Sequence, residues 1–398
     1  MPSTTLFNRL TTPDGRRGWC MWFAMAALLA FGPGSSAAEA AGSGFKVLHV
    51  FGPAEARSAT GDLVEGRGKR LYGTSWYGGA ADSGTVFEIT TDGVMNVTYP
   101  FGPKQRDPHE PVTGLTLAND GNFYGTTADG GSALFGTVFR LAPGKEPRTI
   151  HEFVGGEGIR PTGRLLQGSD GNLYGVTVNS GLGGQPGAIF RVTLDGQLTV
   201  LHNFLYAPEE PHRPYGGLIQ AQDGNYYGTT LFGGPGRGGT IYRMTPSGAV
   251  SVVHGFDENG ADGCAPYAQL LEADDGLLYG TTSACGDHAL GTAFRVTLAG
   301  ALEVLHQFKG GANDGREPRA PLIQASNGDF YGTTCFGGAH NDGTLYRLRT
   351  NGEFTVLHSF DTTDGNGWCP AGALLQASDG RLYGTTSVDG TLFRIRAR

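Results

Sequence analysis

The sequence predicts an all-β fold, a seven-bladed β-propeller with four antiparallel strands in each blade. Glycine makes up 68 of the 398 residues, and each glycine in a helix interior costs about 1 kcal/mol relative to alanine, which argues against a helical protein. Hydrophobic residues account for 39% of the chain and charged residues for 17%, so the chain can bury a core and is not expected to be disordered. The third observation is a unit of roughly 50 residues that recurs seven times.

The repeat is marked by the dipeptide Tyr-Gly, which recurs at intervals of 50 to 53 residues. Its tyrosines are Tyr72, Tyr124, Tyr174, Tyr227, Tyr279, Tyr331 and Tyr383. A proline stands thirteen residues before six of them, at Pro111, Pro161, Pro214, Pro266, Pro318 and Pro370, and Ala59 takes that place in the first unit. So constant a spacing places one copy of the unit in each blade.

Each unit has the pattern of four short strands. In the third unit they are expected at residues 164–167, 172–177, 188–192 and 198–204, with Asp-Gly turns at 170–171 and 195–196. The blades are expected at residues 59–101, 111–153, 161–204, 214–256, 266–308, 318–360 and 370–398. The last unit has only three strands, and residues 45–51 have the pattern of the fourth, so these residues are expected to close the ring and remove its open edges. An open solenoid of β-units is the alternative.

The N-terminus has the pattern of a signal peptide over residues 1–40, followed by a single domain over residues 41–398. Arg9, Arg16 and Arg17 precede an apolar stretch at residues 19–31, and an Ala-x-Ala pattern ends at Ala40. A twin-arginine signal is an alternative export route. The apolar stretch is short for a membrane span, so we expect a secreted or periplasmic protein without a membrane span after cleavage. The net charge of −8 argues against nucleic acid as a partner.

The repeat resembles the GloVer tandem repeat, found in a family of exported bacterial proteins. The resemblance rests on Val-Leu-His-x-Phe, then Pro, then Asp-Gly-Asn-Leu-Tyr-Gly-Thr-Thr, and then Gly-Thr-x-Phe-Arg, with the clearest copies at residues 223–243 and 327–347. It covers residues 45–398 and implies an extracellular or periplasmic location and a repeat architecture, but no activity. More loosely, Asp-Gly-Asn-Leu-Tyr looks like the repeats of sensor propellers and of streptogramin-lyase-type propellers.

Two polar positions recur with the repeat and are interpreted as structural. The first is His49, His151, His202, His254, His306 and His358, with Tyr99 in its place in the first unit. The second is Arg140, Arg191, Arg243, Arg295, Arg347 and Arg394, with Glu88 in its place in the first unit. A group needed in every blade serves packing, so we expect the histidines to bond between blades and the arginines to tie neighbouring blades together. A metal or ligand role is the alternative.

The candidate ligand-binding residues are those that do not repeat and that lie on the long loops, near the channel mouth. They are Arg57, Trp76, Tyr77, His109, Glu110, Arg160, His212, Arg213, Phe232, Arg316, Glu317, Phe336 and Trp368. Histidine beside glutamate or arginine suits an anionic ligand, and the aromatic side chains suit sugar or ligand rings. The alternative is an ordinary solvated loop surface.

The predicted function is a binding or scaffold protein whose partner is a glycan, a small molecule or another extracellular protein, acting as a monomer without a cofactor or a metal ion. The alternative is a carbohydrate-active or lyase-type propeller enzyme that uses histidines and carboxylates at the channel mouth. No residue is assigned as catalytic, because the chain lacks motifs such as Gly-x-Ser-x-Gly or His-Glu-x-x-His. Residues 257–263 and 361–367 resemble calcium loops in composition, but turn chemistry also explains them.

Four cysteines remain after the signal peptide, and an oxidising compartment favours their pairing. Cys264 precedes the first strand of blade 5 and Cys285 follows its second strand, so the two reach the same edge. Cys335 and Cys369 hold the corresponding places in blades 6 and 7, which are neighbours. We therefore expect the disulfides Cys264–Cys285 and Cys335–Cys369. Four reduced thiols are the alternative.

Overall fold

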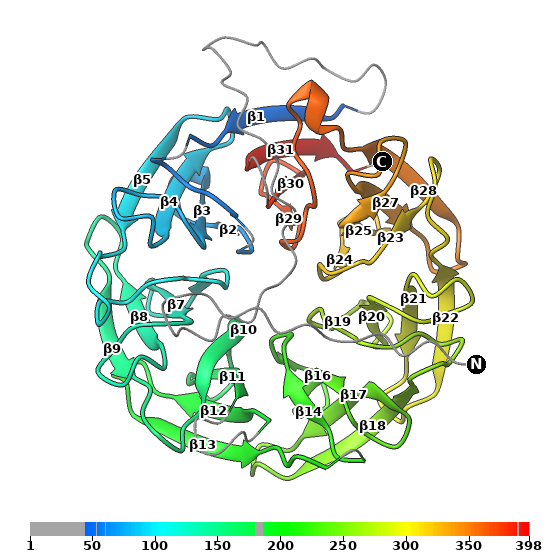
Figure 1. Cartoon of the computed structure of the whole chain (residues 1–398), viewed down its shortest axis with the longest axis horizontal. Coiled ribbons are helices and arrows are strands. Elements are labelled where there is room, and N and C mark those ends of the chain that lie inside the picture. Colours follow the sequence, from blue (N-terminus) through cyan, green and yellow to red (C-terminus); the bar gives the residue numbers. More distant parts are fainter. Residues whose placement is uncertain are drawn as a thin grey trace, which may run out of the picture. The chain divides into compact units, whose positions relative to one another are not determined.

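The computed structural model describes residues 44–397, except Pro53, Thr60, residues 180–185, Pro208 and residues 388–389. The expected signal peptide, residues 1–40, lies outside the described residues. Seven main antiparallel sheets follow one another around a ring, as the repeat predicts (Figure 1). Within the described residues, no helix is long and apolar enough to cross a membrane.

The first three blades each contain four strands in sequence order from the inside outward. Blade 1 is β2 (Val64–Glu65), β3 (Arg70–Ser75), β4 (Thr85–Thr90) and β5 (Met95–Pro100), with a 3₁₀ turn at Arg67–Lys69. Blade 2 is β6 (Thr116–Leu117), β7 (Phe123–Thr127), β8 (Thr137–Leu141) and β9 (Arg148–Glu152). Blade 3 is β10 (Ile159–Gln167), β11 (Leu173–Asn179), β12 (Ala188–Val192) and β13 (Leu198–Asn203).

Blades 4 to 6 keep this order, with two additions. Blade 4 is β15 (Ile219–Gln220), β16 (Tyr226–Phe232), β17 (Arg237–Met244) and β18 (Val250–Asp257), and β14 (His212–Pro214) also pairs with β16. Blade 5 is β19 (Leu271–Glu272), β20 (Leu278–Thr282), β21 (Thr292–Val296) and β22 (Leu302–Gln307). Blade 6 is β24 (Ile323–Gln324), β25 (Phe330–Thr334), β27 (Thr344–Leu348) and β28 (Phe354–Ser359), beside a separate pair of β23 (Gly315–Arg316) and β26 (Phe336–Gly337).

The N-terminal strand closes the ring. Blade 7 consists of β29 (Leu375–Gln376), β30 (Arg381–Thr385), β31 (Thr391–Arg396) and, outermost, β1 (Lys46–Val50), after a 3₁₀ turn at Thr362–Asp364. In Figure 1, β1 in blue lies beside β31 in red, and Val47 faces Phe393 across the antiparallel pair. The predicted closure is therefore confirmed, and the open solenoid is wrong.

The core consists of the repeated aromatic residues, which are buried between neighbouring blades. Phe139 packs with Leu115 of its own blade and with Phe101 of blade 1, for example. The glycine of the Tyr-Gly pair makes room for this ring, because a Cβ on Gly125 would lie 2.6 Å from Cζ of Phe139. The repeat needs glycine there for close packing rather than for a turn.

The repeated tyrosine and histidine also fasten loops. The Tyr124 hydroxyl donates to Asp120 of the preceding Asp-Gly turn at 2.8 Å, and four other blades make the same Tyr–Asp bond. Four of the histidines bond, at 2.8 to 3.1 Å, to a carboxylate six or eight residues later: His49, His151, His254 and His306. The structural interpretation thus fits, although these bonds hold the following loop. Among the described residues, His151 is the repeated histidine that also bonds the next blade, with Nδ1 at 3.2 Å from Gly196 O.

The cysteines pair as the blade topology predicts. Cys264 is bonded to Cys285 within blade 5, with a Cα–Cα distance of 5.2 Å. Cys335 is bonded to Cys369 between blades 6 and 7, with a Cα–Cα distance of 3.9 Å. Both disulfides lie among the long connections and are consistent with an oxidising, extracytoplasmic compartment.

Candidate functional site

The predicted site residues occupy one structural position that recurs in every blade. At this position, the segment that leads into the innermost strand pairs antiparallel with the end of the second strand, next to the long loops. We call these positions the bridge ring. Its pairs are Arg57–Tyr77, His109–Asp129, Ile159–Asn179, His212–Phe232, Cys264–Ala284 and Arg316–Phe336, and in blade 7 the Ser387 amide donates to Trp368 O.

The backbone of the bridge ring is fixed by bonds to two blades. The residue after the first member of each pair has a left-handed backbone, with φ between 50° and 57°, in all seven blades: Ser58, Glu110, Arg160, Arg213, Ala265, Glu317 and Cys369. In blade 2, the Glu110 amide donates to Ser83 O of blade 1, and Glu110 O accepts from the Ala128 amide. Such backbone is uncommon for a residue other than glycine, so the same bonds impose it whatever side chain stands there.

Three blades carry an arginine over the aromatic residue of the bridge ring, and this arginine is the first member of the pair in blades 1 and 6 but the residue after it in blade 4. The guanidinium carbon lies 5.8 Å from the ring centre for Arg57 on Tyr77, 5.7 Å for Arg213 on Phe232 and 4.8 Å for Arg316 on Phe336. Tyr77 and Phe232 are 37% and 43% exposed, which is high for aromatic residues. An arginine over an aromatic face is attracted by the negative face of the ring's quadrupole, and its N–H groups remain free to bond in the plane of the guanidinium.

A first cluster joins blades 1, 2 and 3. The Tyr77 ring stacks on the Trp76 ring with 5.8 Å between the ring centres, and Arg57 Nη2 donates to Asp82 Oδ2 at 2.5 Å. Arg160 reaches Glu110 of the preceding blade at 3.5 Å. Burial, followed by the nearby charge of Glu110, raises the pKa of the Tyr77 hydroxyl, while Arg160 and Arg57 oppose this. The predicted residues of these three blades other than His109 therefore form one group of neighbouring polar and aromatic side chains.

Two further clusters lie on other blades. In blade 4, the centre of the His212 ring is 5.5 Å from that of Tyr206 and 6.1 Å from that of Phe232. Tyr206 is 77% exposed. Between blades 6 and 7, Phe336 contacts Trp368 at 5.7 Å beside the Cys335–Cys369 disulfide.

Two predicted residues fall outside these three clusters. Glu317 pairs with Arg319 at 2.8 Å, and Nδ1 of His109 bonds Asp107 O at 2.8 Å. The predicted residues thus share a ring but form separate clusters rather than one pocket.

A second set of polar and aromatic residues flanks the innermost strands and was not predicted from the sequence. Arg164 and Asp62 stand three residues after the repeated Pro or Ala, and burial lowers the pKa of Arg164 while Asp62 opposes the shift. Tyr215 and Tyr267 stand one residue after it, with ring centres 4.1 Å apart, and burial raises the pKa of Tyr267 well above its usual value. Asp62 and Arg164 are the charged residues at the first of these repeat positions, and Tyr215 and Tyr267 are the tyrosines at the second, so the sequence offered a signal for this set.

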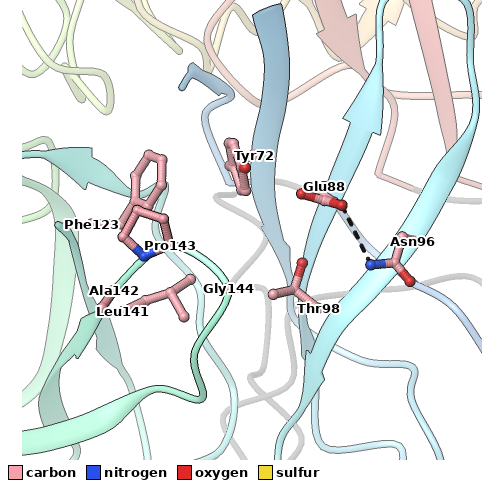
Figure 2. A pocket seen from close by; sticks show the side chains of 9 residues that line it. All are labelled: Tyr72, Glu88, Asn96, Thr98, Phe123, Leu141, Ala142, Pro143 and Gly144. Carbon is pink, nitrogen blue, oxygen red and sulfur yellow. Dashed lines mark hydrogen bonds between the residues drawn. The ribbon is translucent and has the colours of Figure 1, made fainter. Parts of the chain in front are cut away.

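A cleft between blades 1 and 2, shown in Figure 2, was not predicted from the sequence either. Its lining residues are Tyr72, Glu88, Asn96, Thr98, Phe123, Leu141, Ala142, Pro143 and Gly144. Its volume is about 110 Å³, well below the roughly 300–1,000 Å³ of typical small-molecule pockets. The sequence contained a signal for this cleft, because Glu88 and Tyr99 replace the arginine and the histidine that the other units have at these positions.

The loops that resemble calcium sites are held by their own turns. Asp257 accepts from the Asn259 amide at 2.9 Å, and Asp361 accepts from the Thr363 amide at 2.8 Å. Within the described ranges, no three His, Cys, Asp or Glu side chains gather in a way that suits a metal ion.

Comparison with known proteins identifies the family. The profile of the Gloeobacter/Verrucomicrobia repeat matches residues 36–222, 96–272 and 213–398, so the chain belongs to this repeat family. The GloVer resemblance is thereby confirmed. No curated protein sequence shows significant similarity to the chain.

Solved structures share the fold at low sequence identity. A streptogramin B lyase is 12% identical with a TM-score of 0.61, and the match covers 89% of this chain and 97% of the lyase chain. The extracellular domain of a hybrid two-component system from B. thetaiotaomicron is 12% identical with a TM-score of 0.59, covering 89% of this chain but only 41% of that one. At such identity the likeness concerns the propeller alone.

Proposed function

We propose that this member of the Gloeobacter/Verrucomicrobia repeat family is a secreted or periplasmic binding protein that recognises an acidic glycan through the bridge ring. The observation that carries the proposal is that an arginine lies over the aromatic residue of the bridge ring in blades 1, 4 and 6, and that two of these rings, Tyr77 and Phe232, are exposed. The spacing around a ring favours an extended ligand over a small one, because the pairs belong to separate blades.

Each pair offers two kinds of contact. The arginine fork presents several N–H groups in one plane, which matches a carboxylate or sulfate. In Arg316, one of these groups donates to Asn341 Oδ1 at 3.3 Å, which orients the fork over Phe336. The neighbouring aromatic face suits the apolar face of a sugar ring. An acidic saccharide carries both features in every residue of its chain.

The enzyme alternative has weaker support at this ring. General-acid catalysis of glycoside cleavage needs a protonated carboxyl group near a second carboxylate. Glu110 instead faces Arg160, Asp82 faces Arg57 and Glu317 faces Arg319. Carboxylates matched with arginines suit a rigid binding surface better than proton transfer.

The proposal is tested with the mature protein and immobilised or soluble acidic polysaccharides, polygalacturonate and heparin, against neutral dextran. We expect saturable, salt-sensitive binding to an acidic chain and none to dextran. The variants Arg57→Ala, Arg213→Ala and Arg316→Ala are each expected to weaken binding about tenfold, as loss of a charged hydrogen bond does.

The matched control is Arg295→Ala, which removes an arginine paired with Glu303 on the outer strands of blade 5. It should leave binding unchanged. Absence of binding to every acidic chain, or equal weakening by the Arg295 variant, would overturn the proposal. Circular dichroism and thermal melting establish that each variant is folded.

A further inference from the structure

The cleft of Figure 2 lies at a junction between blades where several repeat positions change together. It is formed on the side of the tight turns, between the outer strands of blade 1 and the β8–β9 turn of blade 2. The bridge ring lies among the long connections instead. The cleft is therefore a separate feature, and a ligand bound there would be independent of glycan binding at the bridge ring.

The first change replaces an arginine with Glu88. Two other blades show what the arginine does, because Arg295 donates to Thr350 O and Arg394 donates to Thr91 O, both at 3.3 Å, in the outer turn of the next blade. In blade 2, Pro143 holds the repeat position of Thr350 and Thr91. The carbonyl acceptor expected for residue 88 is therefore that of Pro143. A carboxylate cannot donate to a carbonyl, so Glu88 cannot make this bond to blade 2.

The second change replaces an aliphatic residue with Thr98. The other six blades have Leu48, Ile150, Leu201, Val253, Leu305 and Leu357 at this position. These side chains pack against the next blade. The Thr98 hydroxyl oxygen is buried and has no hydrogen-bond partner within the described structure. A buried polar atom without a partner is costly, and Figure 2 shows this hydroxyl among the residues that line the cleft.

The third change opens the turn of the neighbouring blade. In five blades the glycine of this turn approaches the backbone of the preceding blade so closely that a Cβ would contact its carbonyl: Gly93, Gly196, Gly248, Gly300 and Gly352. In blade 2 this position is held by Lys145, two residues after Pro143, and its own Cβ rules out so close an approach. The turn of blade 2 therefore stands away from blade 1, and the gap is the cleft.

The remaining walls suit a flat cation. The Tyr72 and Phe123 rings lie 4.6 Å apart, centre to centre. Burial and the Glu88 carboxylate raise the pKa of the Tyr72 hydroxyl. Asn96 Nδ2 donates weakly to Glu88 Oε1 at 3.5 Å, and Arg70 bonds the same oxygen at 2.7 Å from a side chain that is 48% exposed.

We propose that this cleft binds a guanidinium group, the side chain of an arginine residue or of a small guanidine compound. The group would occupy the space that the repeat's own arginine fills in other blades. It would donate to Glu88, to the Thr98 hydroxyl and toward the outer turn of blade 2, and lie against the Tyr72–Phe123 rings. A volume of about 110 Å³ admits one such group and not a sugar ring.

The test uses the mature protein and blocked arginine, N-acetylarginine methylamide, with the uncharged citrulline analogue as the matched probe. Calorimetry or NMR titration should show saturable binding of the arginine probe and none of the citrulline probe. Glu88→Gln should weaken binding about tenfold or more, because a charged hydrogen bond is lost. Arg70→Gln should instead tighten it, because the competing guanidinium is removed.

Two further variants make the outcome decisive. Glu88→Arg restores the repeat's own residue, and we expect it to abolish binding while the melting temperature stays equal or rises. Glu303→Gln removes a carboxylate bonded to Arg295 at 2.7 Å in blade 5 and should leave binding unchanged. Agmatine distinguishes a free guanidine compound from a peptide arginine, and saturable binding of either supports the site. Equal binding of citrulline, no saturation by either guanidine, or tighter binding to the Glu88→Arg protein would overturn the proposal.

Discussion

The repeat core and the bridge ring are built from the same units, yet they follow opposite rules. In the core, each unit places a tyrosine, a glycine and an aromatic residue at the same positions, and the aromatic side chains other than Tyr72 are almost fully buried. In the bridge ring, the backbone is equally regular, but the side chains include arginine, histidine, isoleucine, cysteine and tryptophan. A backbone fixed by inter-blade bonds therefore leaves the side chain free to vary, and this is the arrangement expected of a binding surface on a rigid scaffold.

The largest expected loss of stability comes from removing the N-terminal strand that completes blade 7. Deleting residues 44–51 removes β1 and the buried Phe45, Val47 and Phe51. Loss of a single buried Phe side chain costs about 3–5 kcal/mol, so we expect this deletion to lower the free energy of unfolding by more than about 4 kcal/mol. Urea denaturation of the mature protein measures it. An unchanged midpoint and slope would show that β1 is dispensable.

A second expectation compares copies of one repeat position. His306 bonds Asp314, whereas His358 is stacked on Phe45 at 3.5 Å, and its Nε2 is buried without a partner in the described structure. Burial lowers the pKa of His358 from 6.5 to about 4. Because the unfolded chain binds this proton more readily, stability is full above pH 6.5 and falls as the pH drops toward 4, by up to about 3 kcal/mol.

The pH dependence is checked by urea denaturation between pH 7 and pH 4 for the protein and for His358→Phe. The variant keeps a ring against Phe45 but cannot titrate, so its stability should fall less over this range. His306→Phe is the control, since it removes an ion-paired copy. Equal pH profiles for the protein and His358→Phe would contradict the assignment.

Part of the fold and of the candidate site can be predicted from the sequence. The spacing of Tyr124 and Pro111 predicts the frame, because packing of neighbouring blades demands the same residues each time. Topology then predicts the Cys264–Cys285 bond, since it joins the ends of adjacent strands. The cleft at Glu88 was not predicted, because its origin depends on knowing that the arginine of other blades reaches a carbonyl of the next blade. The separation of the bridge ring into clusters likewise depends on side-chain directions that spacing does not give.

A third expectation concerns a single methyl group in the core. In Gly125→Ala the new Cβ would lie 2.6 Å from Phe139, whose ring is 1% exposed and cannot move without shifting Phe101. Overpacking of this kind costs about 1–3 kcal/mol. Thermal and urea denaturation should both show the loss. A stability equal to that of the parent would mean that the aromatic ring, rather than the glycine, adapts.

The smallest effect is expected in the bridge ring itself. His109→Ala removes a half-buried side chain whose Nδ1 bonds Asp107 O, while the antiparallel bridge to Asp129 is made by the backbone and remains. The left-handed backbone of Glu110 is held by bonds to Ser83 O and the Ala128 amide, none of which involves the histidine side chain. We therefore expect a change in the free energy of unfolding within about 0.5 kcal/mol, as for a surface substitution. Measured beside Gly125→Ala in the same blade, a loss of comparable size would show that the ring residues support the fold, and the contrast between the two regions would disappear.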